Sequence, residues 1–383
     1  MTTDTTMHII LLDLGREMRG GQLQVFYLAR ALHHSDGFSV VVACPAGAPL
    51  AREAAAAGIA VLPLPGRRSW SPRALWALRR EARGHARVVL HTHDARAASL
   101  GALCKGTWGA NVPLLHTRRV SYPLGRGLSR RKYLAADAVA AVSAETGGVL
   151  AAAGLDPARI TVIHSGIDPS RYYPRRERGD GRFVFGMVGA LTPQKGHAVL
   201  IEALAALKAG PARSKGDAGA DNVADDVAAD TAGGDVLPPW EVRVVGEGPL
   251  FGILLDRADT LGVSPHMAFL GRQDSRRMLP DCDALVVPSV HGEGSSGVIK
   301  EGWVTGLPVI CSGLASNLEL VRDGENGLVV PPGDAPALAE AMRRIATDAA
   351  LRARLVAGGT ASVAHYTDTR MAEAYMALYR RLR

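Results

Sequence analysis

The chain has 383 residues and a mass of 40.3 kDa, enough for two or three domains of about 150 residues each. Hydrophobic residues make up 47% of the chain and charged residues 21%, which excludes a wholly disordered, collagen-like or coiled-coil protein. Residues 1–180 contain 24 Lys and Arg against 13 Asp and Glu, whereas residues 181–383 contain 20 against 24, so the first half is basic. A basic surface indicates an anionic partner: a phosphorylated substrate, a membrane or nucleic acid.

The first half of the chain alternates short apolar runs with helical stretches. Strands are predicted at residues 8–14, 38–43, 59–64, 88–91, 112–116, 138–142 and 160–163, and helices at 21–34, 48–57, 72–84 and 96–105. Strands that are apolar throughout and separated by helices are typical of a parallel sheet covered on both faces.

The pattern restarts after a segment rich in Pro, Arg and Gly at residues 169–181. Further strands are predicted at 183–188, 241–245, 267–270, 284–287, 308–311 and 328–330, with a helix at 197–207 and helices from 335 onwards. We therefore predict an α/β protein of two doubly wound domains, residues 7–168 and 181–365, with a helix at 366–383 that packs back toward the first domain. Residues 208–239 are poor in large apolar side chains, which predicts a disordered insertion.

Glycine-rich loops follow the first strand of each predicted domain. Gly20 and Gly21 precede a helix, where backbone N–H groups can approach an anion. Gly189 and Lys195 lie at the carboxyl end of the strand 183–188, the edge where open α/β sheets bind ligands. Taken alone, these residues are more typical of a tight turn and a solvated lysine than of a ligand site.

The segment 288–310 is the most informative. Glu293 lies in a loop of Gly and Ser, and Glu301 lies on the helix predicted from Val298. Such a loop ahead of a helix presents N–H donors to a diphosphate, and carboxylates accept hydrogen bonds from sugar hydroxyls. From the spacing alone, two ordinary surface glutamates remain the alternative.

Five motifs in order make the chain resemble the retaining family 4 glycosyltransferases, which have the GT-B fold. They are the GG loop at 20–21, VIHSGID at 162–168, VGALTPQKG at 188–196, VVGEGP at 244–249 and EGSSGVIKE at 293–301. The resemblance implies two Rossmann-like domains facing a central cleft. It also implies that the C-terminal domain binds a nucleotide sugar, with UDP or GDP as its nucleotide, that the N-terminal domain holds the acceptor, and that no metal or other cofactor is required.

The same resemblance implies roles for individual residues. Lys195 matches the lysine that contacts the donor diphosphate, Glu293 the glutamate near the donor sugar, and His116 a histidine that reaches that sugar; these three are the candidate catalytic residues. Glu301 matches the glutamate that holds the ribose hydroxyls. The other donor-binding candidates are Gly20, Gly21, Gly271, Arg272, Gly297 and Val298. The acceptor-binding candidates are His93, Arg118 and Arg119.

The chain departs from the family pattern at positions that bear on the donor. Ala190 stands where the family often has Arg, so one cation near the diphosphate is missing unless Arg118, Arg119 or Arg272 compensates. EGSSG replaces the usual EGFG, and Ser165 stands where Asn is common. These changes leave the identity of the donor open. No side chain is required as a covalent nucleophile, so the expected contribution of the protein is positioning and stabilisation of diphosphate charge.

Two clusters that resemble metal motifs are not expected to bind metal. The run 281–283 (DCD) directly precedes a strand, and His91, His93 and Asp94 have no further ligand nearby in sequence. The cysteines at 44, 104, 282 and 311 show no zinc spacing, which predicts reduced thiols in a cytoplasmic protein.

The basic segment 67–83 carries Trp70, Leu75, Trp76 and Leu78 among its arginines, and a second basic cluster follows at 126–132. One interpretation is a peripheral helix on the anionic inner face of a membrane, and the other is an amphipathic helix of the first domain. There is no apolar run of about 18 residues, so no transmembrane helix is expected, and the polar residues 1–6 do not predict a signal peptide. No base-reading fold is visible, so nucleic acid is not an expected partner.

The leading hypothesis is a retaining glycosyltransferase that moves a sugar from a nucleotide-diphosphate sugar to a hydroxyl of a saccharide or lipid-linked acceptor. The expected setting is the biosynthesis of a cell-envelope saccharide such as lipopolysaccharide. A UDP-sugar epimerase with the GT-B fold and a non-catalytic nucleotide-sugar-binding subunit are the alternatives. The pair Glu293 and Glu301 argues against the epimerase. The cation missing at Ala190 would favour the binding subunit, whereas Lys195 and the Glu pair argue against it.

Overall fold

The computed structural model describes residues 6–65, 71–108, 112–210 and 236–382. The chain divides into two compact units: unit 1 comprises Met1–Ser170, Gly292–Gly297 and Ala364–Arg383, and unit 2 comprises Arg171–His291 and Val298–Val363. The segment Gly292–Gly297 groups with unit 1, whereas the sequence prediction placed it in the second domain. Of the predicted insertion 208–239, residues 211–235 lie outside the described residues.

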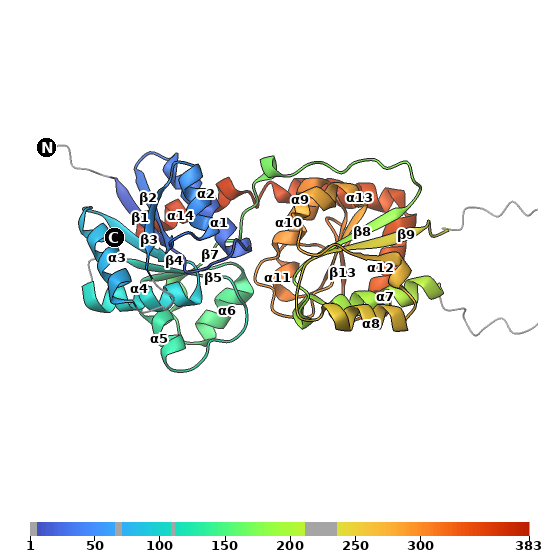
Figure 1. Cartoon of the computed structure of the whole chain (residues 1–383), viewed down its shortest axis with the longest axis horizontal. Coiled ribbons are helices and arrows are strands. Elements are labelled where there is room, and N and C mark those ends of the chain that lie inside the picture. Colours follow the sequence, from blue (N-terminus) through green and yellow to red (C-terminus); the bar gives the residue numbers. More distant parts are fainter. Residues whose placement is uncertain (1–5, 66–70, 109–111, 211–235, 383) are drawn as a thin grey trace, which may run out of the picture. The chain divides into compact units, whose positions relative to one another are not determined.

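Unit 1 is a parallel sheet with helices on both faces (Figure 1). Its strands are β1 (Met7–Leu12), β2 (Phe38–Pro45), β3 (Ala60–Leu64), β4 (Val88–Thr92), β5 (Leu114–Arg118), β6 (Ala138–Ala141) and β7 (Ile160–Val162). Its helices are α1 (Gly20–His33), α2 (Pro49–Ala56), α3 (Pro72–Arg83), α4 (Ala95–Trp108), α5 (Leu128–Leu134), α6 (Ala144–Ala152) and α14 (Asp368–Arg381). The strands follow the spatial order β3-β2-β1-β4-β5-β6-β7. From β1 the chain builds the sheet outward first to one side and then, starting with β4, to the other, so the strand order reverses between β1 and β4. Ligand sites of open α/β sheets form at the carboxyl ends of strands at such a reversal.

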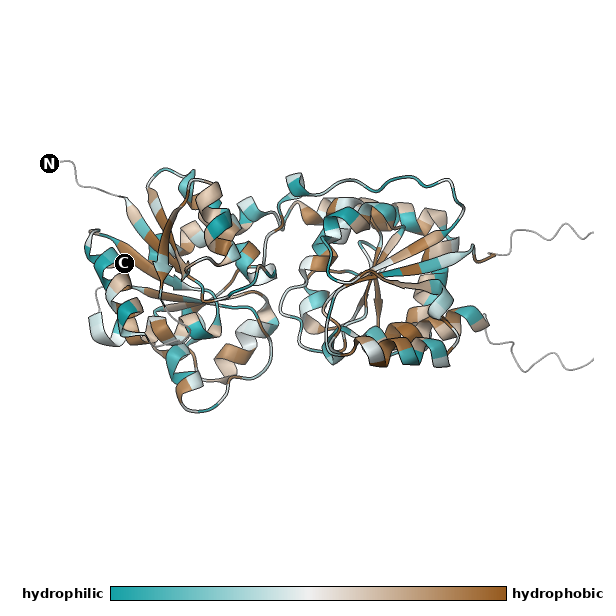
Figure 2. Cartoon of the chain, viewed as in Figure 1, coloured by the Kyte–Doolittle hydropathy of each residue, from teal (hydrophilic) through white to brown (hydrophobic). Residues whose placement is uncertain are grey.

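Both faces of the unit 1 sheet are apolar because successive side chains of a strand point to opposite faces. Ile9 and Leu11 of β1 pack in the layer under α1, α2 and α14. Ile10 and Leu12 pack in the layer under α3, α4 and α5, which also contains Leu78 of α3. The strands are accordingly mostly brown in the hydropathy view, with teal at their polar residues, whereas the helices alternate brown and teal more often (Figure 2).

Unit 2 repeats the architecture with a smaller parallel sheet (Figure 1). Its strands are β8 (Phe183–Val188), β9 (Trp240–Val245), β10 (Met267–Phe269), β11 (Ala284–Val287), β12 (Val309–Ser312) and β13 (Leu328–Val330). Its helices are α7 (His197–Ala209), α8 (Phe251–Thr260), α9 (Ser275–Met278), α10 (Gly297–Thr305), α11 (Ala315–Leu318), α12 (Ala335–Thr347) and α13 (Ala349–Val363). The order β10-β9-β8-β11-β12-β13 reverses between β8 and β11, so the second site is expected at the carboxyl ends of these two strands.

Residues of the VIHSGID motif fasten the end of the chain to unit 1. Gly166 exchanges two hydrogen bonds with the side chain of Gln24 on α1, at 2.7 and 2.8 Å. A Cβ atom on Gly166 would lie 2.6 Å from the Cα atom of Asp368, so only glycine fits there. The Arg30 guanidinium of α1 donates to both Asp168 and Asp368 at 2.7 Å. This motif therefore holds α1, the chain after β7 and the start of α14 together.

Candidate functional site

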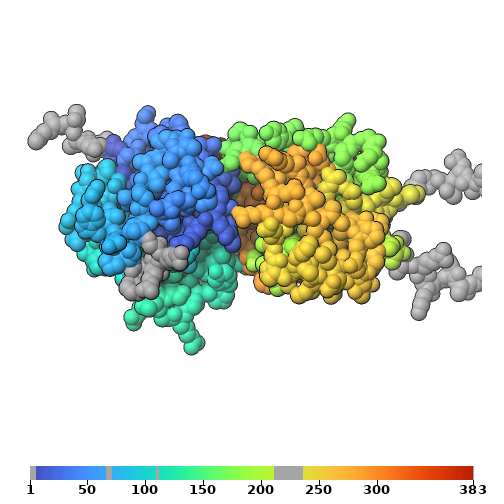
Figure 3. All heavy atoms as spheres, in the orientation of Figure 1, coloured from blue at the N-terminus to red at the C-terminus, as the bar shows by residue number. Residues whose placement is uncertain are grey.

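A cavity of about 340 Å³ opens at the carboxyl ends of β4 and β5 in unit 1. Its walls are the turn between β4 and α4, the loop 119–125 and one side of α5. This loop and α5 project as the teal segment at the lower edge of unit 1 (Figure 3). The cavity therefore lies next to the reversal of strand order at which a ligand site is expected.

Two adjacent arginines line the cavity. Arg118 is 4% exposed, and its guanidinium lies over the rings of Tyr122 and Tyr133, with centroid distances of 5.5 and 5.4 Å. Arg118 also donates to the carbonyl of Tyr122. Arg119 lies beside His93, with Nη2 3.4 Å from Nδ1, and burial lowers the pKa of Arg119. Among the described residues, neither arginine has a carboxylate within ion-pair distance, and the Nε atom of each is buried without a hydrogen-bond partner.

Lys132 adds a third cation to the cavity, and Asp94 is the acidic residue of its lining. The Lys132 ammonium donates to the carbonyl of Ala95 at 2.7 Å, and burial lowers the pKa of this lysine. The Asp94 carboxylate caps α4, accepting from the Ala97 amide at 3.0 Å, and also accepts from the Leu14 amide at 2.5 Å. Asp94 is thus committed to the backbone, and the cavity keeps an excess of positive charge.

His93 is a neutral hydrogen-bond donor at the cavity wall. It is 4% exposed, and burial, followed by the charge of Arg119, holds the pKa of His93 well below its usual value. Because a guanidinium can only donate, His93 Nδ1 accepts from Arg119 and Nε2 carries the proton. Nε2 is buried, and no hydrogen-bond partner for it exists among the described residues.

His116, a predicted catalytic residue, lies behind the cavity rather than on its wall. Its Nδ1 lies 2.5 Å from the Thr92 hydroxyl and its Nε2 lies 3.1 Å from the carbonyl of Lys132. Since the carbonyl can only accept, Nε2 carries the proton and Nδ1 accepts. Burial lowers the pKa of His116 to about 4. In this structure His116 fixes the backbone of α5, and its contact with a donor sugar stays a prediction.

The loop between β1 and α1 places the predicted glycines beside Arg119. Asp13 is buried after β1 and accepts from the Gly15 amide at 2.7 Å and from Gln22 at 3.0 Å. A Cβ atom on Gly20 would meet nothing within 4 Å, and one on Gly21 would lie 3.6 Å from Cδ of Arg119. The start of α1 is therefore open at Gly20, as an approaching ligand would require.

Lys195 of unit 2 follows β8 in a short 3₁₀ turn (Pro193–Lys195). Gly196, which ends this turn, has φ +74°, and a Cβ atom there would lie 1.9 Å from the carbonyl oxygen of Pro288. Glycine is thus obligatory, and it lets the Lys195 turn approach the end of β11. In the VVGEGP motif, a Cβ atom on Gly246 would lie 1.8 Å from the carbonyl oxygen of Gly189. Both glycines bring the loops after β8, β9 and β11 close together.

Helix α10 contributes the second half of the unit 2 site. It begins at Gly297, which is exposed and where a Cβ atom would meet nothing within 4 Å; Val298 follows and is half-buried. Glu301 accepts hydrogen bonds from Tyr172 and from the Ser275 hydroxyl, the latter at 2.7 Å. Burial raises the pKa of Glu301. The contacts of this helix start with a diphosphate and of Glu301 with a ribose stay predictions.

Gly271 and Arg272, two further donor-binding candidates, follow β10 in unit 2. Gly271 has φ +65°, and its carbonyl accepts from the Gly246 amide at 2.9 Å. The side chain of Arg272 is exposed, and its amide lies 3.4 Å from the Glu247 carboxylate. Both residues therefore lie beside the glycine loops described above.

Glu293 groups with the cavity residues of unit 1. It is 7% exposed, and its carbonyl accepts from the Ser121 hydroxyl at 3.1 Å. A Cβ atom on Gly294 would lie 2.1 Å from the carbonyl oxygen of Arg119. The Gly/Ser loop thus packs on the loop that follows β5.

The predicted residues therefore fall into two groups. His93, Arg118, Arg119 and Glu293 belong to unit 1, whereas Lys195 and the other donor candidates from Gly271 to Glu301 belong to unit 2, apart from Gly297. Sequence reasoning assigned Lys132 to a surface charge cluster and overlooked Ser275. Neither residue could have been found from the sequence. Lys132 belongs to a basic run and Ser275 is a lone serine, and both patterns are common on protein surfaces.

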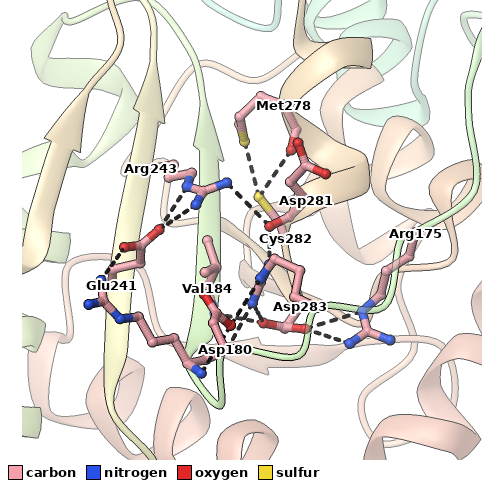
Figure 4. A network of polar contacts seen from close by, with 11 residues as sticks. Arg175, Asp180, Val184, Glu241, Arg243, Met278, Asp281, Cys282 and Asp283 are labelled. Carbon is pink, nitrogen blue, oxygen red and sulfur yellow. Dashed lines mark hydrogen bonds and ion pairs between the residues drawn. The ribbon is translucent and has the colours of Figure 1, made fainter.

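The run 281–283 is used by an ion-pair network rather than arranged as a metal site (Figure 4). Asp283 accepts from the Val184 amide at 2.7 Å, from Arg175 at 2.6 Å and from Arg178. Although burial opposes it, these donors hold the pKa of Asp283 below its usual value. Within the described ranges, the group of three side chains that could hold a metal ion is instead His8, Glu81 and His85. His8 is the second residue of β1 and lies near the amino ends of the strands, whereas the cavity lies at their carboxyl ends.

The predicted membrane segment is partly described. Its helix α3 buries Leu78 in the core of unit 1 and leaves Trp76 63% exposed, with the guanidinium of Arg80 5.4 Å from the Trp76 ring. Trp70 lies outside the described residues. In the part of the chain that the structure describes, no helix has both the length and the apolar character that crossing a membrane requires.

Two family models match consecutive parts of the chain: Glycosyltransferase Family 4 over residues 18–171 and Glycosyl transferases group 1 over residues 182–348. The two parallel-sheet units correspond to the GT-B architecture. HepE from Anabaena, solved in complex with UDP and glucose, has this fold and superposes with a TM-score of 0.78, at 20% identity over 98% of this chain and 100% of HepE. The chain belongs to the family 4 glycosyltransferases, because the two family models together match most of its length.

Curated relatives include a D-inositol 3-phosphate glycosyltransferase from Salinispora arenicola, 27% identical over 78% of this chain and 69% of that protein. The lipopolysaccharide core biosynthesis glycosyltransferase LpsE from Rhizobium meliloti is 36% identical over 37% of this chain and 42% of LpsE. These matches agree with the class of enzyme that the family models define.

Proposed function

We propose that the protein is a retaining glycosyltransferase that transfers a sugar from a nucleotide-diphosphate sugar to an acceptor hydroxyl. The observation that carries this proposal is the order of segments along the chain: Lys195 lies in the turn after β8, and α10, with its open start at Gly297, is the helix after β11, and these two strands flank the reversal of strand order in unit 2. An ammonium group and helix N–H groups are suited to a diphosphate. The complex of HepE with UDP and glucose supports the same class of donor.

In the proposed reaction the acceptor oxygen forms a bond to the anomeric carbon on the face from which the diphosphate leaves. The bond between that carbon and the diphosphate oxygen breaks, and the acceptor proton passes to the departing diphosphate. Lys195 and the amides at the start of α10 stabilise the negative charge that develops on the diphosphate. Glu301 holds the ribose, and the unit 1 cavity holds the acceptor. No step is assigned to a metal ion.

We further propose an acceptor from a cell-envelope saccharide, presented at an anionic membrane. LpsE, a lipopolysaccharide core enzyme, supports the class of acceptor. The exposed Trp76 beside Arg80 on α3, together with Leu128, which is 81% exposed at the start of α5 near Arg130 and Arg131, supports contact with lipid headgroups.

The test of the activity is release of nucleoside diphosphate from a panel of UDP- and GDP-sugars, with and without saccharide acceptors. Substituting Lys195→Ala or Glu293→Ala is expected to lower turnover by about 100-fold, as removal of a transition-state contact does. Lys208→Ala is the matched control, because Lys208 is exposed at the end of α7 and its bond among the described residues goes to the Gly262 carbonyl.

Four outcomes would contradict the proposal. Wild-type turnover in both folded variants would contradict the assigned site. A product whose anomeric configuration is inverted, as measured by NMR, would contradict the retaining mechanism. Loss of activity in EDTA, with recovery on adding a divalent cation, would remove the metal-independent mechanism. A product that is an epimer of the donor, formed without acceptor, would identify an epimerase instead.

A further inference from the structure

We infer that the unit 1 cavity is an anion site that recognises a phosphate group on the acceptor, held by Arg118, Arg119 and Lys132. This inference rests on the proposed function, because it assigns a chemical class to the acceptor of that reaction. It adds one requirement to that function: the acceptor must carry a dianionic group.

The charge balance of the cavity is the first argument. Arg118, Arg119 and Lys132 line it together with one carboxylate, that of Asp94, which is engaged with backbone amides. Among the described residues none of the three cations has a carboxylate within 4 Å. With His93 neutral, the lining carries two more positive than negative charges, and a phosphate monoester carries close to two negative charges at neutral pH. Burying unpaired cations is costly, so a bound dianion relieves this cost.

The preorganisation of the donors is the second argument. The rings of Tyr122 and Tyr133 hold Arg118 through cation–π contacts, and the Lys132 ammonium is held by the Ala95 carbonyl. Arg119 is held against His93. Side chains fixed in this way lose little conformational entropy when a ligand binds. Guanidinium groups also match the geometry of phosphate oxygens better than ammonium groups do.

Unsatisfied donors are the third argument. The Nε atoms of Arg118 and Arg119 and the Nε2 atom of His93 are buried and have no hydrogen-bond partner among the described residues. Buried N–H groups are nearly always paired in folded proteins, so three lining residues with an unpaired buried nitrogen mark a region where the protein supplies too few acceptors. A phosphate group offers three strongly accepting oxygens.

The size of the cavity limits the ligand. A volume of about 340 Å³ lies at the lower end of small-molecule sites, which suits a phosphorylated monosaccharide or polyol. The same group can come from a free sugar phosphate or from the headgroup of a phospholipid. Exposed Leu128 and Tyr122 stand on the same projecting loop and helix, so both sources are tested below.

The experiment is calorimetric titration of the full chain with D-inositol 3-phosphate, glycerol 3-phosphate and inorganic phosphate, against inositol and glycerol. The phosphorylated probes are expected to bind at least about 10-fold more tightly than their neutral parents, since hydrogen bonds to charged groups are strong. Arg118→Gln, Arg119→Gln and Lys132→Gln should each remove most of this preference. Lys195→Ala should keep it, because the donor diphosphate site is separate. Arg52→Gln, an exposed arginine of α2, is the matched control.

The lipid arm uses sedimentation with phosphatidylcholine vesicles that do or do not contain phosphatidylinositol. Binding that depends on phosphatidylinositol, and is lost in Arg119→Gln and in Lys132→Gln, assigns the phosphate to a lipid headgroup; binding of the soluble probes alone assigns it to a free sugar phosphate. Circular dichroism verifies that each variant folds. If a variant of a buried arginine does not fold, the Lys132→Gln variant provides the test in its place.

Two results would overturn the inference. One is equal affinity of the wild type for phosphorylated and neutral probes, and the other is a phosphate preference that vanishes only in Lys195→Ala. Titration with UDP is run in parallel, because the donor reports on the proposed function alone. Tight UDP binding without any phosphate preference would leave the glycosyltransferase proposal standing and remove the anion site. Absence of binding to both UDP and GDP would instead contradict the proposed function.

Discussion

Buried basic residues serve two different purposes in this molecule. In the cavity of unit 1 the cations point at space that a ligand can enter, whereas Lys300 of α10 is buried among packed residues of unit 2. Burial lowers the pKa of Lys300 to about 7. Its unfolded pKa is about 10.4. The unfolded chain therefore binds more protons between these values, and folding is less favourable at neutral pH than at high pH.

This difference predicts the effect of Lys300→Met, which keeps the length of the side chain without its charge. One pKa unit corresponds to about 1.4 kcal/mol, so the variant should be more stable than the wild type by roughly 2–4 kcal/mol at pH 7. The advantage should shrink as the pH rises toward 10, because the wild-type penalty is present below the lowered pKa and disappears above the unfolded pKa. Urea denaturation at several pH values measures it. A wild type that is the more stable protein at pH 7 would contradict the prediction.

Elements of the structure depend on polar contacts that link distant segments. Asp283 at the start of β11 joins the Val184 amide of β8 to two arginines in the segment before β8, whereas Asp281 forms an exposed pair with Arg176 at 3.0 Å. The two aspartates of one run thus have different environments. Buried charged hydrogen bonds stabilise more than exposed ion pairs do.

Asp283→Asn is therefore expected to destabilise unit 2 by about 2 kcal/mol, and the matched Asp281→Asn by less than about 0.5 kcal/mol. Because the folded pKa of Asp283 is lowered, its contribution is complete above the usual carboxyl pKa of about 3.9 and is lost as the pH falls through the lower folded value. The gap between the wild type and Asp283→Asn should narrow in that acidic range. Chemical denaturation at pH 7 and near pH 3 tests both statements, and equal losses in the two variants would refute the first.

The positions of regular elements could be predicted from the sequence where their periodicity is strong. The first strand, expected at 8–14, is Met7–Leu12, and the helix expected at 21–34 is Gly20–His33. Helices α5 and α6 were not predicted, because one is short and basic and the other is rich in Ala and Gly, so neither shows a clear apolar stripe.

The contacts of the site could be predicted only in part, because they depend on which face of a strand a residue occupies. His116 and Thr117 are neighbours in sequence, yet His116 faces α5 and Thr117 contacts His91 and Tyr375 on the opposite face. Likewise, the contact between Ser121 and Glu293 joins residues 172 positions apart, and no local pattern encodes such a distance.

At the scale of the whole molecule, the chain returns to unit 1 after completing unit 2, and α14 closes the first core. Tyr375 and Tyr379 are buried there, and the Tyr379 hydroxyl lies 2.6 Å from His91 Nδ1 on β4. Helix α14 packs against α1, and the Arg30 pairs with Asp168 and Asp368 fix its start. Because unit 1 is assembled from both ends of the chain, its stability depends on the C-terminal helix α14.

Removing residues 366–383 is therefore expected to unfold unit 1 and leave unit 2 folded. Each large apolar side chain withdrawn from a core costs roughly 2–5 kcal/mol, so losing several exceeds the typical stability of a domain, about 5–15 kcal/mol. Hydrogen exchange measured by mass spectrometry should show loss of protection in β1 and β4 and retained protection in β8 and β11. Arg381→Gln, an exposed residue at the end of α14, should keep both. Protection of β1 at the wild-type level in the truncated chain would show that the first core closes without α14.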